Sequence, residues 1–284
     1  MQSETTYRFA RGWFLLGFEE ELAVGDSRQL RYFDEDLVLT RTASGAARVL
    51  SAPSASARAW AVREREGMIF VWHDPAGGPP EYDIDAIEER ANPGWSRWYH
   101  SKIEVKTHPR EIVENVADRA HFGVVHRFHV EHFRAEFDGH RATQHLVGRG
   151  EKDWGEGIKP VTSTATYHGP AYQVTKLCGL FDVYLVNAHT PVDDGSLDLR
   201  FAVSLRGADG PACSARTAQI AAMYVNAIRD GFFEDVAIWE HKVYRDVPVL
   251  CDADGPIMQL RRWYEQFFRA GERVRDAGAG SAIS

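Results

Sequence analysis

Residues 114–126 (ENVADRAHFGVVH) bring together the side-chain types that bind metal ions, in an otherwise helix-compatible stretch. Neutral imidazole, offered by His121 and His126, is the commonest protein ligand for iron and zinc. Asp118 lies three positions before His121, so on a helix the two side chains share a face and can touch. A carboxylate placed in this way can orient a ligand imidazole. The stretch therefore predicts part of a metal site.

The spacing of the two histidines limits how that site can form. Five positions on an ideal helix place His121 and His126 about 140° apart, at about 100° per residue. They can bind one ion only if the helix ends or distorts between them, and Gly123 is the expected place. A third ligand must come from elsewhere in the chain.

The candidate third ligand is Asp235, in a long helical pattern over residues 212–241. It is the one charged member of an otherwise apolar helix face formed by Ala221, Val225, Ile228, Phe232, Asp235 and Trp239. A carboxylate on an apolar face costs several kcal/mol unless it is paired, hydrogen-bonded or metal-bound. The neighbouring Glu234 lies on a more polar stripe. Two histidines and one carboxylate are the facial triad of non-haem Fe(II) enzymes.

Spacing alone leaves other interpretations open. Two histidines five residues apart are more often structural or surface residues than metal ligands. His129 and His132 follow closely and fit a site by spacing equally well. A buried Asp235 also suits a structural ion pair, with Arg245 or Arg261 as its partner.

Composition narrows the class of protein. The chain has 284 residues, of which 44% are hydrophobic and 26% charged, as in ordinary globular proteins. A net charge of −8 argues against a nucleic-acid partner or an anionic membrane surface. No apolar run approaches the roughly 18 residues of a membrane span, and the N-terminus shows no signal peptide. Three widely spaced cysteines predict free thiols and a cytoplasmic location.

The first hundred residues predict short strands, and the rest a larger α+β unit. In the first part, strands are expected at 13–18, 29–33, 36–42, 47–50, 60–65 and 67–73, with a low-complexity joint at 51–59 and a short helix at 86–92. In the second, a strand at 98–107 precedes a helix that begins at Pro109. An antiparallel sheet of five or six strands, the helix at 212–241, a shorter helix at 256–269 and a flexible tail should follow.

Four stretches are similar to one family. Residues 114–126 resemble the mononuclear-iron motif of the Rieske non-haem iron oxygenases. Residues 231–268 (GFFEDVAIWEHKVYRDVPVLCDADGPIMQLRRWYEQFF) resemble the branch that contains the 3-ketosteroid 9α-hydroxylase oxygenase component and the cholesterol desaturases. Residues 7–18 and 57–80 also look like that branch, so the similarity covers nearly the whole chain.

The resemblance implies roles and a fold. His121 and His126 correspond to iron ligands, and Asp235 to the carboxylate ligand. Asp118 corresponds to the carboxylate that joins a ligand histidine to the neighbouring subunit's iron–sulfur cluster, and Asn115 to an amide near the iron. The implied fold is α+β: a truncated all-β Rieske-like scaffold (1–94, junction 51–59), an antiparallel helix-grip catalytic domain with a long C-terminal helix (95–271), and a flexible tail (272–284). The family's usual assembly is a three-fold ring.

One departure from the family changes the expected chemistry. A Rieske cluster is held by two cysteines and two histidines, but before residue 100 this chain has no cysteine and one histidine, His73. In place of the cluster-binding loops stands the joint 51–59. The sequence therefore predicts mononuclear Fe(II) without a [2Fe–2S] cluster in this chain.

Three functions remain compatible with these features. The favoured one is an oxygenase that uses O2 on a hydrophobic, steroid-like substrate. A Rieske-bearing partner, ferredoxin or reductase would supply its electrons, in a homotrimer or a mixed trimer or hexamer. The second is a non-redox hydratase, hydrolase or isomerase that uses the metal as a Lewis acid. The third is a non-catalytic binding or assembly subunit. The first is favoured because the triad and Asp118 are all present.

Overall fold

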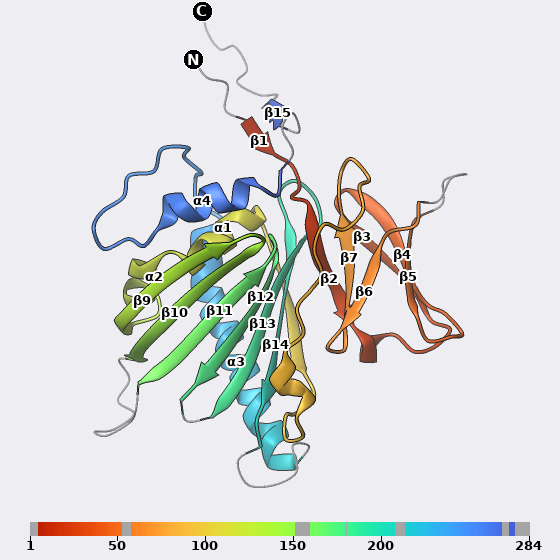
Figure 1. Cartoon of the computed structure of the whole chain (residues 1–284), viewed down its shortest axis with the longest axis horizontal. Helices are drawn as coiled ribbons and strands as arrows, with labels where there is room; N and C mark the ends of the chain where they lie inside the picture. The colour runs from red at the N-terminus through yellow and green to blue at the C-terminus, as the bar shows by residue number, and fades with distance from the viewer. Residues whose placement is uncertain are drawn as a thin grey trace, which may run out of the picture.

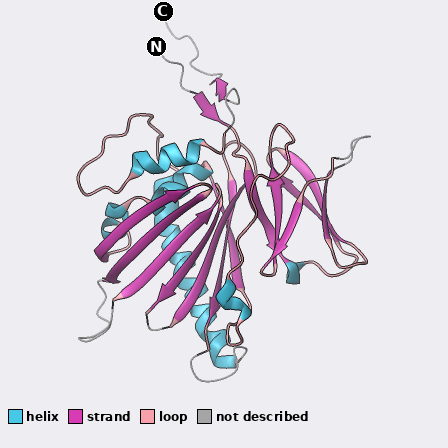
Figure 2. Cartoon of the chain, in the orientation of Figure 1, coloured by secondary structure: helices cyan, strands magenta, loops and turns pink. Residues whose placement is uncertain are grey.

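The computed structural model describes residues 5–52, 58–150, 160–179, 181–207, 214–268 and 273–275, with backbone alone for 5–7 and 273–275. A small all-β lobe stands beside a large antiparallel sheet that is crossed on one face by a long helix (Figure 1). Figure 2 distinguishes the helices from the strands by colour. Within the described residues, no helix is long and apolar enough to cross a membrane.

The small lobe consists of two three-stranded antiparallel sheets. Their orders are β2-β7-β6 and β3-β4-β5. All six strands match predicted ones, because β-favouring residues between turn signals indicate strands. Their bounds are β2 (Gly12–Phe18), β3 (Ser27–Tyr32), β4 (Glu35–Arg41), β5 (Ala47–Ser51), β6 (Val62–Arg65) and β7 (Met68–His73). A 3-10 turn, η1 (Glu19–Glu21), follows β2.

The connection between β5 and β6 is tied down at both ends. The Ser51 N–H donates to the Arg58 carbonyl at 2.9 Å, and the Trp60 N–H donates to the Val49 carbonyl at 3.0 Å. The Trp60 indole N–H also donates to Ser51 Oγ at 3.1 Å, and the Arg58 guanidinium lies 4.1 Å from the Trp60 ring centre. The predicted joint 51–59 is therefore held by pairing at its ends, whereas residues 53–57 lie outside the described part.

The large sheet has seven strands in the order β8-β14-β13-β12-β11-β10-β9, all antiparallel. The sequence predicted five or six, and the unpredicted strand is β9, which contains His129 and His132. The strands are β8 (Tyr99–Val105), β9 (Phe128–Asp138), β10 (Arg141–Gly150), β11 (Val161–His168), β12 (Tyr172–Cys178), β13 (Asp182–Pro191) and β14 (Leu197–Leu205). Helix α3 (Ala215–Trp239) packs against β8 and β14.

The helix predicted from Pro109 is divided into three short pieces. These are α1 (Pro109–Val113), η3 (Glu114–Val116) and α2 (Arg119–Val124). The division has a local cause: Asp118 has an extended backbone and caps the start of α2 with its side chain. The remaining helical elements are η2 (Glu88–Ala91), at the predicted short helix, and α4 (Ile257–Glu265).

Two short strands from opposite parts of the sequence pair with each other (Figure 1). Strand β1 (Thr5–Tyr7) pairs antiparallel with β15 (Arg273–Arg275). Strand β15 falls within the predicted flexible tail, 272–284, which remains a prediction. Residues 276–284 lie outside the described part.

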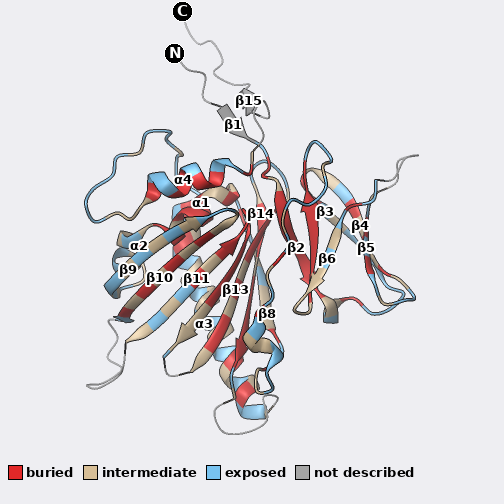
Figure 3. Cartoon of the chain, viewed as in Figure 1, coloured by how far each residue is buried: buried red, intermediate tan, exposed pale blue. Residues whose placement is uncertain are grey.

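A continuous core joins the lobe to the sheet (Figure 3). One buried cluster includes Phe14 and Val71 of the lobe together with Tyr167 of β11 and Trp263 of α4. Hydrogen bonds also cross between the parts, including Thr190 Oγ1 to the Leu15 carbonyl at 2.7 Å. The domain boundary at 94/95 remains a prediction.

We expect the protein to lose stability in mild acid, because three of its histidines are buried. Burial lowers the pKa of His73, His168 and His189 from 6.5 to about 4. Between these values the unfolded chain binds more protons than the folded chain. Stability is therefore fully present above pH 6.5 and falls as the pH drops toward 4, by up to about 1.4 kcal/mol per pH unit for each group. Urea unfolding at several pH values measures this, and His189→Gln should flatten the slope. Equal unfolding free energies at pH 7 and pH 5 would contradict it.

Candidate metal centre

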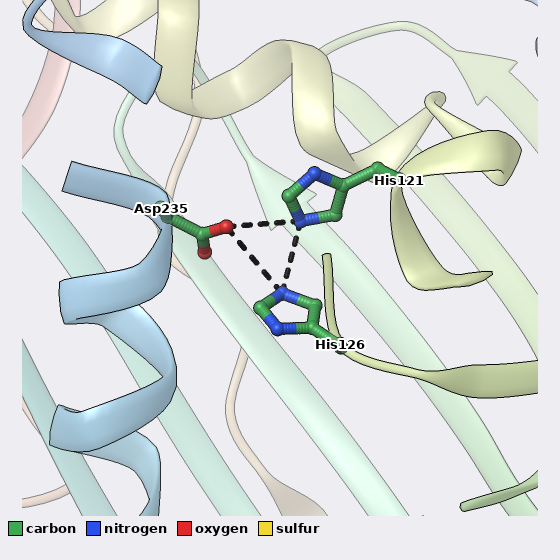
Figure 4. A group of neighbouring side chains, drawn as sticks. All are labelled: His121, His126 and Asp235. Atoms are coloured by element: carbon green, nitrogen blue, oxygen red, sulfur yellow. Dashed lines mark hydrogen bonds and ion pairs between the residues drawn. The ribbon is translucent and has the colours of Figure 1, made fainter. Parts of the chain in front are cut away.

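Three side chains from two distant segments converge on one point (Figure 4). His121 Nε2 lies 2.9 Å from His126 Nε2 and 3.1 Å from Asp235 Oδ1. His126 Nε2 lies 3.5 Å from the same carboxylate oxygen. Among the described residues this is the one group of three or more histidine, cysteine or acidic side chains that could hold a metal ion.

The local backbone explains how histidines five positions apart can meet. Asp118 Oδ1 accepts the backbone N–H of His121 at 3.1 Å and so fixes the start of α2. The helix ends at Val124, and Arg127 adopts a positive φ of 51°, which turns the chain. His126 is thus off the helix, and its ring lies at 83° to that of His121. The predicted end of the helix between the two histidines is confirmed. Asp118 was expected to touch the side chain of His121, but its hydrogen bond is to the backbone N–H of that residue.

Helix α3 supplies the carboxylate from its sheet-facing side. Asp235 is 3% exposed, as the periodicity of the helix predicted. One turn further on, the buried Trp239 donates its indole N–H to Asn115 Oδ1 at 3.4 Å. The Asn115 amide nitrogen lies 3.5 Å from His121 Nε2. The amide is therefore held at the edge of the group of three side chains.

The competing partners considered from spacing lie elsewhere. Arg261 Nε donates to Glu114 Oε2 at 2.6 Å, so it does not form the alternative ion pair with Asp235. His129 and His132 belong to strand β9 and are not part of the group. Glu234 is 60% exposed and lies 3.4 Å from His126 Nδ1.

The charges within the group reinforce one another. Burial raises the pKa of the Asp235 carboxyl, but hydrogen bonds and charge from the two imidazoles outweigh this and hold the pKa below its usual value. Burial lowers the pKa of His126, whereas Asp235 and then Glu234 raise it, and the net pKa is above normal. The carboxylate is thus ionised at neutral pH and faces the two ring nitrogens.

These residues fit a divalent ion. Asp235 Oδ1 is buried and lies 3.1 and 3.5 Å from the Nε2 atoms of His121 and His126, and the three side chains point toward one another. Ligand atoms about 2.1 Å from an ion and at right angles to each other lie about 3.0 Å apart. The three separations in the group, 2.9, 3.1 and 3.5 Å, are close to this value. Two nitrogens and one carboxylate oxygen form a donor set that suits Fe(II).

A cavity of about 290 Å³ opens beside the three side chains. This is close to the lower end of the usual range for ligand pockets. The lining includes apolar residues, namely Ile112, Val116, Phe122, Ala165, Leu177, Leu185, Ile228 and Phe232. Polar residues lie among them, since Gln144, Ala165, Thr175 and Leu185 are successive cross-strand partners. Asn187 Nδ2 donates to Gln173 Oε1 at 3.0 Å, and Asn187 Oδ1 is buried without a partner.

The sequence reasoning missed the polar residues of this lining. Gln144, Gln173, Thr175 and Asn187 line the cavity from strands β10, β12 and β13. The available signal was polar residues at inward positions of otherwise buried strands. That signal becomes readable only when the face that each strand turns to the cavity is known.

Solved structures of the same fold are Rieske-type monooxygenases. Dicamba monooxygenase bound to dicamba superimposes with a TM-score of 0.69 at 14% identity, covering 90% of this chain and 96% of that one. A quaternary ammonium Rieske monooxygenase gives a TM-score of 0.63 at 14% identity, covering 92% and 90%. The shared architecture is a mixed α+β fold with a large antiparallel sheet and a C-terminal helix.

Sequence comparison defines the branch. The model of the 3-ketosteroid 9α-hydroxylase C-terminal domain matches residues 71–268. A probable 3-ketosteroid-9-alpha-monooxygenase oxygenase component from Rhodococcus rhodochrous is 33% identical, covering 94% of this chain and 82% of that protein. The Mycobacterium tuberculosis oxygenase component is 35% identical, covering 75% and 58%, and the Caenorhabditis elegans cholesterol 7-desaturase is 28% identical, covering 74% and 54%.

The chain therefore belongs to the 3-ketosteroid 9α-hydroxylase branch of the Rieske oxygenase family. It is homologous to the oxygenase components of that branch.

Proposed function

We propose that this chain is a mononuclear non-haem iron oxygenase subunit, of the monooxygenase type, that acts on a hydrophobic, steroid-like substrate with electrons from a separate protein. The observation that carries the proposal is the convergence of His121, His126 and Asp235 beside a cavity with many apolar lining residues. Two relatives are named as 3-ketosteroid monooxygenase components, and this supports a steroid-like substrate for this chain.

The proposal gives individual residues the following roles. His121, His126 and Asp235 would hold Fe(II), and the bound iron would supply the O2 chemistry of the family. The apolar side chains of the cavity lining receive the hydrocarbon body of the substrate and exclude water. Gln173 and Asn187 can bind a keto or hydroxyl group, since Asn187 Oδ1 lacks a partner. Asn115 sits beside His121, where its amide can orient a group at the site.

The electron source is proposed to be a different chain. Without two cysteines and two histidines the small lobe cannot form a Rieske cluster, and before residue 100 the sequence offers His73 alone. The alignment with the first relative runs over 329 positions, more than the 284 residues of this chain, so that relative has residues with no counterpart here. We therefore assign residues 1–94 to a Rieske-like scaffold without cluster-binding loops, and 95–271 to the helix-grip catalytic domain.

A reconstitution experiment tests the function. The Fe(II)-loaded chain is mixed with a 3-ketosteroid, and O2 consumption is followed with and without an added Rieske protein, its reductase and NADH. We expect substrate-dependent O2 uptake in the complete mixture alone, because the iron needs electrons that this chain does not carry. Product formed without O2 or reductant would contradict the proposal and favour Lewis-acid chemistry.

A further inference from the structure

Five charged side chains form a group next to the segment that carries the two histidines. It consists of Glu111 and Glu114 on the α1–η3 segment, Arg110 beside them, Lys242 after α3 and Arg261 on α4. We refer to these five residues as the Glu114 cluster. Nothing in the proposed chemistry uses it.

Glu114 is the centre of this cluster. Lys242 Nζ donates to Glu114 Oε1 at 2.6 Å, and Arg261 Nε donates to Glu114 Oε2 at 2.6 Å. The Glu114 side chain is 9% exposed, and each of its oxygens is bound by one cation, with side chains that are 29% exposed for Lys242 and 10% for Arg261. Lys242 also lies 3.0 Å from Glu111 Oε2. Charge-assisted hydrogen bonds of this length are the strong ones.

The cluster spans the two parts of the metal centre. Glu114 directly precedes Asn115, and its carbonyl accepts the N–H of Ala117 at 3.0 Å and of Asp118 at 3.1 Å. This turn sets the position of Asp118, which in turn fixes the start of the helix that bears His121. From the other side, Lys242 follows α3, seven residues after Asp235. A shift of Glu114 would therefore move the imidazoles relative to the carboxylate.

Stability alone does not account for such a cluster. Hydrophobic residues of similar volume often replace a buried ion group with no loss of stability, because removing charges from water is costly. What an ion group adds is a defined geometry. A metal site requires its ligands to be held within about 0.5 Å by a supporting shell of side chains.

We propose that Glu114 is a positioning residue for the metal centre, fixing the separation between the histidine-bearing segment and α3 through Lys242 and Arg261. This inference rests on the proposed metal site. Its effect is on the assembly of the three ligands, because Glu114 itself does not reach them.

The chain offers a matched control. Asp198 is also buried, with a side chain that is 6% exposed, and it also lies between two cations, Lys102 at 3.0 Å and Arg200 at 3.2 Å. It lies on β14, where it also accepts the Tyr32 hydroxyl of the small lobe at 2.6 Å, and no residue of the metal group contacts it. Asp198→Asn and Glu114→Gln therefore remove the same kind of charge from the same kind of setting.

The test measures Co²⁺ affinity of the full chain from the cobalt absorption bands, alongside urea unfolding without metal. We expect Glu114→Gln to weaken Co²⁺ binding by about 10- to 100-fold, the usual effect of losing a group that supports a ligand. Asp198→Asn should lower stability while leaving the affinity unchanged. In a double-mutant cycle, Glu114→Gln and Lys242→Met should be non-additive in affinity, because they break the same contact.

Equal affinity in the unchanged chain and Glu114→Gln would overturn the positioning role and leave the metal site intact. An equal loss in Glu114→Gln and Asp198→Asn would also overturn it, since the effect would then be one of general stability. If the unchanged chain binds no Co²⁺ or Fe²⁺, the metal site itself is wrong, and the inference fails with it.

Discussion

Asp235→Ala is expected to abolish metal retention, lowering the iron content of the purified protein to a small fraction of that of the unchanged chain. Loss of a supporting group costs about 10- to 100-fold in metal affinity, and loss of a ligand should cost more. The two imidazoles, 2.9 Å apart, would then face each other without the carboxylate that balances a divalent charge. Elemental analysis and Co²⁺ titration measure the effect.

Glu234→Ala is the matched control, because Glu234 is the adjacent acidic residue but is 60% exposed and lies 3.4 Å from the outer nitrogen of His126. Its metal content should stay near that of the unchanged chain. Asp235→Asn removes the charge but keeps the shape of the side chain. It therefore controls for misfolding caused by the cavity that alanine would leave. If Asp235→Ala retains its iron, the triad is wrongly assigned.

Asp118→Asn is expected to separate metal binding from electron delivery. Asparagine caps a helix as well as aspartate does, so the hydrogen bond to the His121 N–H and the start of α2 should persist. The negative charge is lost, and with it the carboxylate proposed to link the site to an electron donor. Iron content should hold while partner-dependent O2 uptake falls by about 10- to 100-fold.

Asp118→Ala distinguishes the two roles of this residue. It removes the cap as well as the charge, which should destabilise the protein by a further amount of about 1 kcal/mol. If Asp118→Asn takes up O2 at the unchanged rate with the partner present, the carboxylate has no part in electron delivery and serves α2 as a cap alone.

The burial of Asp235 could be predicted from the sequence because its signal is local. A charged residue on the apolar face of a 25-residue helix is visible as a break in a regular pattern, and Asp235 is buried where that pattern places it. The histidine spacing likewise required a helix end, and α2 ends at Val124. The lobe strands were predictable for the same reason, since each carries its own β-favouring residues between turn signals.

The features that escaped prediction depend on distant partners. Strand β9 is an exception, since its half-buried residues, Phe128, Val130, Phe133, Ala135 and Phe137, are all apolar and its partner is the next strand, β10. A register shift at Glu131 interrupts their alternation and so weakens the sequence pattern. Strand β15 forms only through β1, at the opposite end of the chain. Arg261 was considered as a partner of Asp235, but it pairs with Glu114 instead. Residues 147 positions apart leave no local trace of their pairing.

The paired ends of the connection between β5 and β6 have a consequence for how this fold can change length. Two backbone hydrogen bonds, Ser51 to Arg58 and Trp60 to Val49, hold the two ends of this connection together. They do not depend on the length of the segment between Ser51 and Arg58. Doubling the length of a flexible loop costs only about 0.6 kcal/mol. A domain whose N- and C-termini lie close together can therefore be inserted between Ser51 and Arg58 without disturbing β8–β14 or α3. The same position suits the graft of a reporter domain.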